Sequence, residues 1–368
     1  MSFLAALASI AVLAVLIVVH ELGHFLAARL QGIYANRFSL GFGPIIWKYQ
    51  GSQTEYAVRA LPLGGFVGFP DDDPDSEIPP NDPNLLRNRP IFDRAIVISA
   101  GVIANLIFAY FLLVVQDGTV GTPKFINRPG VLISAVSPQS SLVAQEAGIK
   151  PGDVILALNG NNLGMGQNAI NSLQQKIQSS PNQVLELKIQ REQNTLSVKL
   201  KPELKDGNGV IGVGLNMNSE VVRKRATNPF EAFTSAAEEY QRIILLTIQG
   251  FGQLISNFRE TANQVSGPVA IVDIGAKIAS SDPFSLFQFA ALISINLAII
   301  NILPLPALDG GQLAFLLIEG VRGKPLPTEI QQNIMQTGLV LLLGLGIFLI
   351  VRDTANLVPT SWVQNLFQ

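Results

Sequence analysis

The chain has only two histidines, and they lie four residues apart in the run His20-Glu21-Leu22-Gly23-His24. On a helix, residues at this spacing share one face, so the two imidazoles can hold one metal ion. Zinc suits such a site because it takes nitrogen and oxygen ligands in a tetrahedron and keeps one position for water. Glu21 is placed to take a proton from that water and pass it to a leaving amine. The spacing therefore predicts a zinc hydrolase with Glu21 as its base.

A catalytic zinc of this kind needs a third protein ligand. The chain has no cysteine and no further histidine, so the ligand must be a carboxylate or another oxygen. Asp309 is the candidate, because it directly follows an apolar segment, in the Pro- and Gly-broken run LPLPALDGG. Glu319 is the alternative carboxylate and lies farther along the chain.

The composition places this site in a membrane. Hydrophobic residues make up 48% of the chain and charged residues 14%, whereas soluble proteins average about 25% charged residues. Four apolar stretches approach the ~20 residues that a bilayer requires: about 3–30, 95–115, 284–303 and 334–351. The two histidines fall inside the first, where ionisable residues are costly and usually functional. A soluble zinc protease with a separate anchor is therefore excluded, and a net charge of −2 without a basic tract excludes a nucleic-acid partner.

Basic residues predict the orientation of the spans. Lys and Arg gather in the loop between the first and second spans and again between the third and fourth. Both loops are expected in the cytoplasm, which leaves the segment 117–282 outside. We expect a bacterial inner membrane, with the active site toward the cytoplasm. A cleaved signal peptide is the alternative for the first stretch, but no basic residue precedes it and the apolar run continues past His24.

The connector 33–69 is unusually apolar and combines strand-like pieces with glycines. It predicts a β-hairpin or sheet that dips into the membrane, where protein must satisfy its backbone hydrogen bonds. The strands around Gly41, Gly43, Gly64 and Gly65 could then pair with an unwound substrate as an added strand. An ordinary hairpin at the membrane interface is the alternative.

Residues 121–204 alternate strand and helix patterns and predict a soluble α/β module. Its run AGIKPGDVILALNG resembles the PDZ domains of bacterial envelope proteases, which bind peptides by adding a strand to a sheet edge. The resemblance places the peptide groove at Gly130, Val131 and Leu132. The alternative is that the module binds nothing and only excludes bulky substrates. Beyond it, residues 229–260 predict an amphipathic helix on the membrane surface, capped by Asn228 before Pro229.

Five features occur in order along the chain. They are HELGH, Gly41-Phe42-Gly43, the run LPLGG at 61–65, the PDZ module and LPLPALDGG. Together they resemble the site-2 protease family of intramembrane zinc proteases, in its bacterial RseP-like branch. The resemblance implies that Zn²⁺ is held by His20, His24 and Asp309.

The same resemblance implies roles for three asparagines. Asn296 and Asn301 would line the site and hold the substrate backbone or the oxyanion, with interhelical hydrogen bonding as the alternative. Asn105 matches the family's Gly-Pro-x-x-Asn pattern in the second span, with Val102 where proline is usual, and we expect it near the substrate.

The sequence thus predicts an α-helical polytopic membrane protein with about four transmembrane helices, a membrane-embedded β-hairpin or sheet and an inserted α/β PDZ domain. The expected parts are a membrane core (1–120), the PDZ domain (121–204), a linker with the amphipathic helix (205–280) and a second membrane core (281–368). The expected substrates are single-span membrane proteins already trimmed by another protease. The resemblance implies regulated intramembrane proteolysis, for example of an anti-sigma factor, or removal of remnant signal peptides. A peptide-binding receptor with a vestigial zinc set is the competing hypothesis, against which the intact Glu21 argues.

Overall fold

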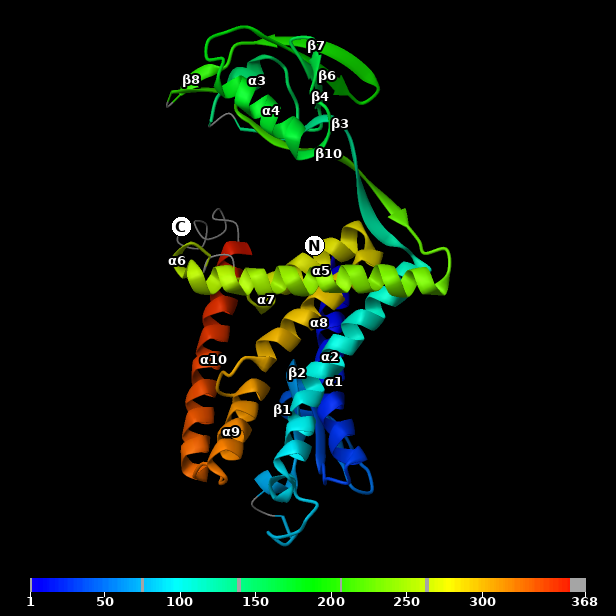
Figure 1. Cartoon of the computed structure of the whole chain (residues 1–368), viewed down its shortest axis with the longest axis vertical. Helices are drawn as coiled ribbons and strands as arrows, with labels where there is room; N and C mark the ends of the chain where they lie inside the picture. Colours follow the sequence, from blue (N-terminus) through cyan, green and yellow to red (C-terminus); the bar gives the residue numbers. More distant parts are fainter. Residues whose placement is uncertain (1, 74–75, 138–139, 206, 262–264, 358–368) are drawn as a thin grey trace, which may run out of the picture. The chain divides into compact units, whose positions relative to one another are not determined.

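Four helices dominate the structure, and each is long and apolar enough to cross a membrane. They are α1 (Phe3–Leu30), α2 (Ile91–Thr119), α8 (Leu286–Ile302) with the turn η4 (Pro283–Ser285) before it, and α10 (Thr328–Leu357). The computed structural model describes residues 2–73, 76–137, 140–205, 207–261 and 265–357 (Figure 1). The four expected spans are confirmed. α2 and α10 extend beyond the predicted ends because apolar length marks only the part of a helix that lies in hydrocarbon.

The chain divides into two units, Met1–Gly121 with Arg225–Gln368, and Thr122–Lys224. In the first unit, α1 and α2 approach closely at Gly23, where an added Cβ would come within 3.0 Å of Ala100 and Ala104. Small residues allow such backbone contacts between helices that no hydrophobic force drives together in lipid. α8 joins α2 through the Ser294 hydroxyl, which donates to the Asn105 carbonyl at 2.8 Å.

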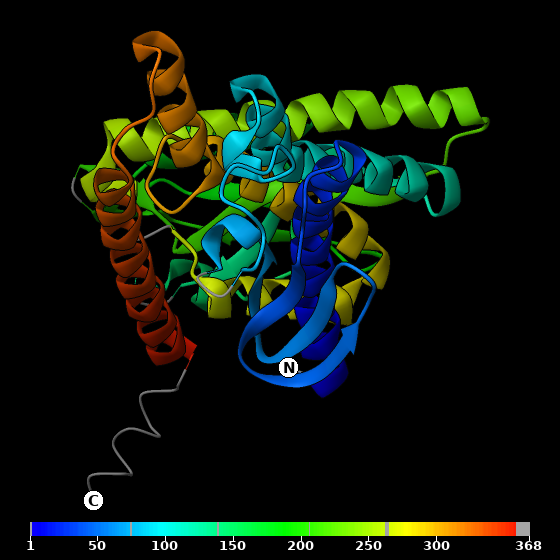
Figure 2. The same ribbon diagram turned by 90° about the horizontal axis from the view of Figure 1, so that it is seen from below.

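The connector between α1 and α2 forms the strands β1 (Arg37–Gln50) and β2 (Glu55–Gly68), which lie beside α1 (Figure 2). Both strands bend, so they make four paired segments. Residues 45–50 pair antiparallel with 55–59, and residues 37–40 pair with 55–58 in parallel and with 65–68 antiparallel. The expected hairpin or sheet is therefore a small sheet in which 65–68 is an end segment. Gly41, Gly43 and Gly64 take positive φ angles of 86°, 82° and 126° where the strands bend.

α5 (Pro229–Ser256) starts as predicted, with the Asn228 side chain accepting a hydrogen bond from the Glu231 N–H. Its inner face contacts α2 and α8, where Ala236 and Ile243 are buried, and Figure 1 shows it crossing one end of the helices. Its other face exposes large apolar side chains, including Phe233 and Leu246. The helix therefore packs on the spanning helices with one face and presents apolar side chains on the other. The remaining helical elements of this unit are η1 (Pro70–Asp72), η2 (Leu86–Asn88), α6 (Phe258–Thr261), α7 (Pro268–Ser281) and α9 (Asp309–Arg322).

The second unit has its own hydrophobic core around a six-stranded sheet. The sheet runs in the order β10-β3-β4-β6-β7, and β5 pairs with β4. Its elements are β3 (Thr122–Val136), β4 (Val154–Leu158), β5 (Asn161–Asn162), β6 (Leu185–Arg191), β7 (Asn194–Leu200), β10 (Val213–Lys224), α3 (Val143–Glu146) and α4 (Gly166–Gln178); β8 (Glu203–Lys205) and β9 (Asn208–Val210) form a separate pair. This is the α/β PDZ domain that the sequence predicts.

Two expectations about this unit are wrong. The domain ends at Lys224 rather than at 204, because β10 pairs antiparallel with β3 along most of its length. The groove was expected at Gly130, Val131 and Leu132, but these residues lie in β3, which is paired on both sides by β10 and β4. Val131 is 0% exposed, and a Cβ at Gly130 would come within 3.0 Å of the Ile155 carbonyl. An interior strand cannot accept an added peptide, whereas β10 stands at the end of the sheet.

Candidate active site

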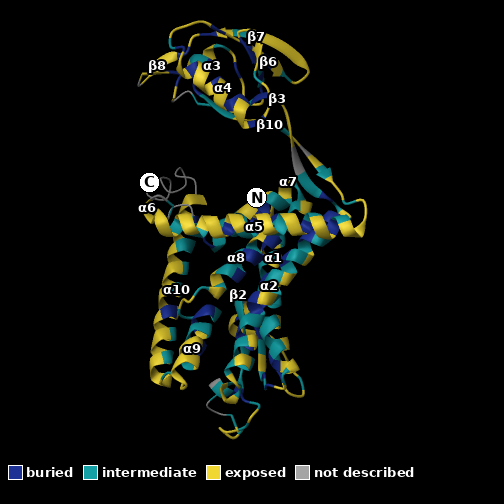
Figure 3. Ribbon diagram, in the orientation of Figure 1, coloured by how far each residue is buried: buried dark blue, intermediate teal, exposed yellow. Residues whose placement is uncertain are grey.

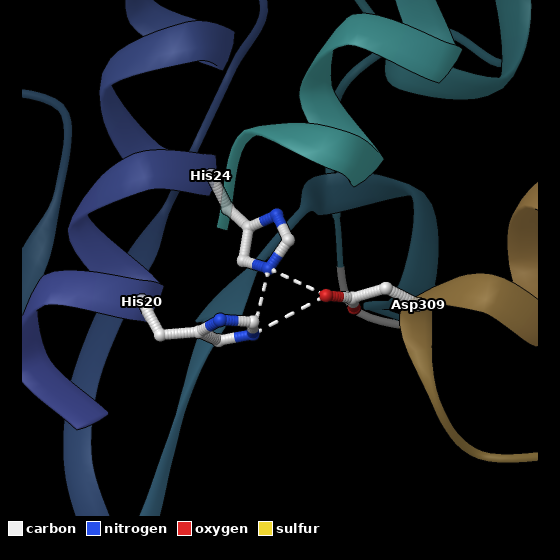
Figure 4. Close-up of side chains that lie close together, drawn as sticks. All are labelled: His20, His24 and Asp309. Atoms are coloured by element: carbon white, nitrogen blue, oxygen red, sulfur yellow. Dashed lines mark hydrogen bonds and ion pairs between the residues drawn. The ribbon is translucent and has the colours of Figure 1, made fainter. Parts of the chain in front are cut away.

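The three predicted metal ligands converge (Figure 4). His20 and His24 lie one turn apart on α1, and their Nε2 atoms are 3.2 Å apart. The Asp309 Oδ2 lies 3.2 Å from the His20 Nε2 and 3.4 Å from the His24 Nε2. Asp309 is the first residue of α9. The side chains are only 9%, 12% and 16% exposed, so the cluster is largely closed to solvent.

These distances fit a tetrahedral metal. Ligand atoms bonded at about 2.1 Å to zinc lie roughly 3.4 Å from one another, close to the three observed separations. The His24 Nδ1 lies 2.8 Å from the Val97 carbonyl, which can only accept a hydrogen bond. The proton therefore sits on Nδ1, and Nε2 presents a lone pair to the cluster. Acceptor atoms that face one another in a mostly buried place repel unless a metal ion or a proton lies between them, so these residues fit zinc.

Asn105 orients the imidazole of His20. Its side-chain amide lies 3.3 Å from the His20 Nδ1, and the Asn105 Oδ1 is buried without a hydrogen-bond partner among the described residues. With the amide turned so that Oδ1 faces His20, the Nδ1–H donates to it and Nε2 is left for the metal. Asn105 is 0% exposed. The expectation that it binds substrate is therefore wrong, because it contacts a ligand from behind.

The two asparagines of α8 have different hydrogen-bond partners. The Asn301 Nδ2 lies 3.3 Å from the His20 Nε2, at the metal side of the ring. The Asn296 Oδ1 instead accepts a hydrogen bond of 3.0 Å from the Thr247 hydroxyl of α5. The structure thus brings Asn301 to the cluster, whereas Asn296 makes the interhelical hydrogen bond that was its alternative role.

The sheet reaches the site beside Glu21. A Cβ on Gly65 would lie 2.9 Å from the Glu21 Cγ and 3.0 Å from the Ser39 carbonyl, so only glycine fits there. The Val67 backbone also lies near the Glu21 carboxylate. Gly64, its neighbour, packs against the Phe42 ring. The end segment 65–68 therefore lies next to the base.

Several supports of the site escaped the sequence analysis. A Cβ on Gly101 of α2 would come within 3.0 Å of both imidazoles. Gly310 and Gly311 lie under backbone carbonyls of the preceding loop, where a Cβ would also collide. Gly101 belongs to the GVIAN run that was noticed, but nothing in that pattern shows which residues it faces.

Glu319 is not a ligand. Its carboxylate forms two hydrogen bonds with the Arg94 guanidinium, at 3.0 and 2.5 Å. Both side chains are 15% exposed. The pair ties the start of α2 to α9, the helix that begins with Asp309, and so helps to place the third ligand.

Comparisons with known proteins show the family of the chain. The model of peptidase family M50 matches residues 8–345. The chain is 64% identical to "Putative zinc metalloprotease all3971" of Nostoc sp. (strain PCC 7120), over 98% of this chain and 99% of that protein. It is 48% identical to the chloroplastic membrane metalloprotease ARASP of Arabidopsis thaliana, over 97% of this chain and 80% of that protein.

A third relative is the regulator of sigma-E protease RseP of Escherichia coli, at 31% identity over 95% of this chain and 98% of that protein. The PDZ domain of the SdrC-like protein of Listeria monocytogenes matches 24% of this chain and 90% of that domain, with 17% identity and a TM-score of 0.21. The chain belongs to peptidase family M50 and is an integral membrane metalloprotease of the site-2 type, in the RseP-like branch.

Proposed function

We propose that this enzyme cleaves single-span membrane proteins within or beside their membrane segments, with zinc bound by His20, His24 and Asp309. One observation carries the proposal: three acceptor atoms converge at zinc-like separations on and beside α1, a helix long enough to span the bilayer. Bound zinc lowers the pKa of a coordinated water and polarises the scissile carbonyl.

The chain's own residues supply the proton transfers. Glu21 lies between the two histidines in sequence and takes the proton of the attacking water, then delivers it to the leaving nitrogen. Gly65 of the sheet packs against the Glu21 Cγ and so confines the side chain of the base. The Asn301 amide lies at the metal side of His20, where its N–H can donate to the oxygen of the scissile carbonyl as negative charge develops.

We propose that the substrate binds as an extended strand at segment 65–68. A helical substrate hides its carbonyls in its own hydrogen bonds, so it must unwind before water can attack. Segment 65–68 pairs with 37–40 on one side, and among the described residues no strand pairs with its other side. Main-chain pairing at that edge would hold an unwound substrate beside Glu21.

Proline substitutions test this binding mode. Phe66→Pro and Val58→Pro each remove a backbone donor from the small sheet. We expect both to abolish cleavage of a helical substrate and of an already unwound one, while zinc content stays at the wild-type level. Intact cleavage of both substrates would contradict strand binding.

The proposed orientation follows from the charge pattern, and the proposed partners and role follow from the resemblance to the family. We propose a bacterial inner membrane, with the active site toward the cytoplasm and the PDZ domain outside. The PDZ domain would either exclude untrimmed substrates or bind a peptide, and then along the end strand β10. The cellular role would be regulated intramembrane proteolysis, for example of an anti-sigma factor, or removal of remnant signal peptides.

The deciding experiment compares wild type with Glu21→Gln in detergent, with a tagged single-span substrate and with zinc measured on the same samples. We expect stoichiometric zinc in both proteins and cleavage only by wild type, because the substituted amide keeps the shape of the side chain and cannot act as a base. Equal cleavage by both proteins would remove Glu21 from the mechanism. Absence of zinc from wild type would overturn the metal site.

A further inference from the structure

The loop that presents Asp309 has a backbone conformation that its sequence does not favour. Residues 303–308 connect α8 to α9, and Ala307 takes a φ of 65°. Residues with a Cβ rarely adopt this left-handed region, apart from Asn and Asp. Ala307 has no polar side chain that could stabilise it locally. Such a conformation persists only when its surroundings hold it, so contacts from outside the loop must do so.

α10 provides these contacts. The Ala307 N–H donates a hydrogen bond to the Met335 Sδ at 3.3 Å. Three residues farther along the same helix face, Gly338 lies against Pro306, and a Cβ there would come within 3.0 Å of Pro306 backbone atoms. A pocket beside this contact is lined by both the loop and α10, including Leu305, Pro306, Thr337 and Gly338. Met335 and Gly338 thus give the loop two contacts from α10.

α10 makes few other contacts that could share this role. Among its described residues only Gly338 and Asp353 are buried, and most of the helix is exposed in Figure 3. Asp353 lies at the far end, where its carboxylate accepts a hydrogen bond from the Ala270 N–H of α7 at 3.0 Å. The helix is thus held at two points, and one of them is the ligand loop.

A shift of this loop reaches the metal ligand directly. Asp309 follows Ala307 by two residues, and the first turn of α9 is locked to the loop by its glycines. A Cβ on Gly310 would collide with the Leu303 carbonyl, and one on Gly311 with the Leu305 carbonyl. The loop and the start of α9 therefore move together, and the distances from the Asp309 Oδ2 to the two imidazoles move with them.

We propose that Met335 and Gly338 hold the strained loop and thereby set the position of Asp309, so that Met335 is a positioning residue for the metal site. This inference rests on the proposed zinc site. It assigns to α10 a role that its lipid-facing apolar sequence does not suggest.

The test measures metal binding rather than activity alone. Met335→Leu keeps the side-chain volume and removes the sulfur acceptor. We expect zinc to leave this variant about 10-fold faster in chelator competition, as for other changes behind a metal ligand. In the Co²⁺-substituted protein, the visible absorption of the tetrahedral ion should shift. Leu343→Ala, on the exposed part of α10, is the control and should match wild type.

A second substitution separates positioning from simple packing. Ala307→Gly relieves the strain, because glycine adopts positive φ freely. In the Met335→Leu background it should restore most of the zinc retention and the Co²⁺ spectrum. Gly338→Ala should release zinc faster, whereas Gly344→Ala, where a Cβ meets nothing within 4 Å, should not.

The outcomes distinguish this inference from the proposed function. If wild type retains zinc and Met335→Leu matches it in release rate and spectrum, the positioning role is overturned. The role is also overturned if Ala307→Gly fails to rescue Met335→Leu, because the strain would then not be what Met335 opposes. A wild-type protein without zinc would overturn the metal site and this inference together.

Discussion

Gly101 lies where α2 passes the two imidazoles, and alanine at this position tests how closely the ligands are fitted. A Cβ there would lie 2.7 Å from the His24 Cε1 and 2.8 Å from the His20 Cε1, whereas ordinary contacts begin at 3.4 Å. The two Cε1 distances require ring movements of about 0.6 to 0.7 Å, and the His24 ring must move farther because its Nε2 lies closer still to the new Cβ; a preorganised site tolerates only ~0.5 Å. We expect Gly101→Ala to weaken zinc binding about 10–100-fold, or by about 1.4–2.7 kcal/mol.

The assay is chelator competition on purified protein, with thermal unfolding of the metal-free form as a check on folding. Gly344→Ala makes the same chemical change in another spanning helix, where the new Cβ meets nothing within 4 Å. Helix propensity alone would make either substitution neutral or stabilising by up to ~1 kcal/mol. The reasoning is refuted if Gly101→Ala retains wild-type zinc affinity, or if Gly344→Ala weakens it equally.

Three further predictions test other supports. Asn105→Ala removes the amide at the His20 Nδ1, and chelator competition should show zinc affinity lowered about 10-fold. Arg94→Ala leaves the Glu319 carboxylate mostly buried without its guanidinium; thermal unfolding should show a loss of about 3–5 kcal/mol, partly recovered by exchanging the two charges. In the PDZ domain, the hydrogen bond from Arg191 holds the pKa of Asp153 below its usual 3.8. The ionised carboxylate therefore stabilises the fold above that pH, and this stabilisation is lost as the pH falls through the lower pKa of the folded state. Asp153→Asn should remove the pH dependence of the unfolding free energy of segment 122–224 and lower that free energy by about 1.5–3 kcal/mol at neutral pH.

Local patterns in the sequence predicted the spans and the metal ligands. A helix presents His20 and His24 on one face whatever surrounds it, and apolar length alone marks a spanning segment. Asp309 could be proposed because no cysteine or further histidine remained. The supports of these ligands could not be predicted in this way. Gly101 faces the imidazoles because of how α1 and α2 cross, and no local pattern encodes a crossing.

The PDZ domain shows a second limit. Its inner strands lie within residues 121–204, the segment that the sequence predicted as an α/β module. β10 was missed because its partner, β3, lies far away in sequence, and its pairing is a tertiary contact. The groove was placed on Gly130 to Leu132 by resemblance to other domains, without knowledge of which strand ends the sheet. Only the strand order shows that β3 is interior.

The glycines show how the site and the helix assembly depend on each other. Near the site, a Cβ would collide with neighbouring atoms at six of them: Gly23, Gly65, Gly101, Gly310, Gly311 and Gly338. On the exposed part of α10, Gly344 and Gly346 have nothing within 4 Å. Because lipid supplies no hydrophobic force between spans, close backbone packing must hold them together. The contacts that assemble the helices are thus the same contacts that fix the ligand positions, so zinc affinity measured in glycine variants also reports on how the spans pack.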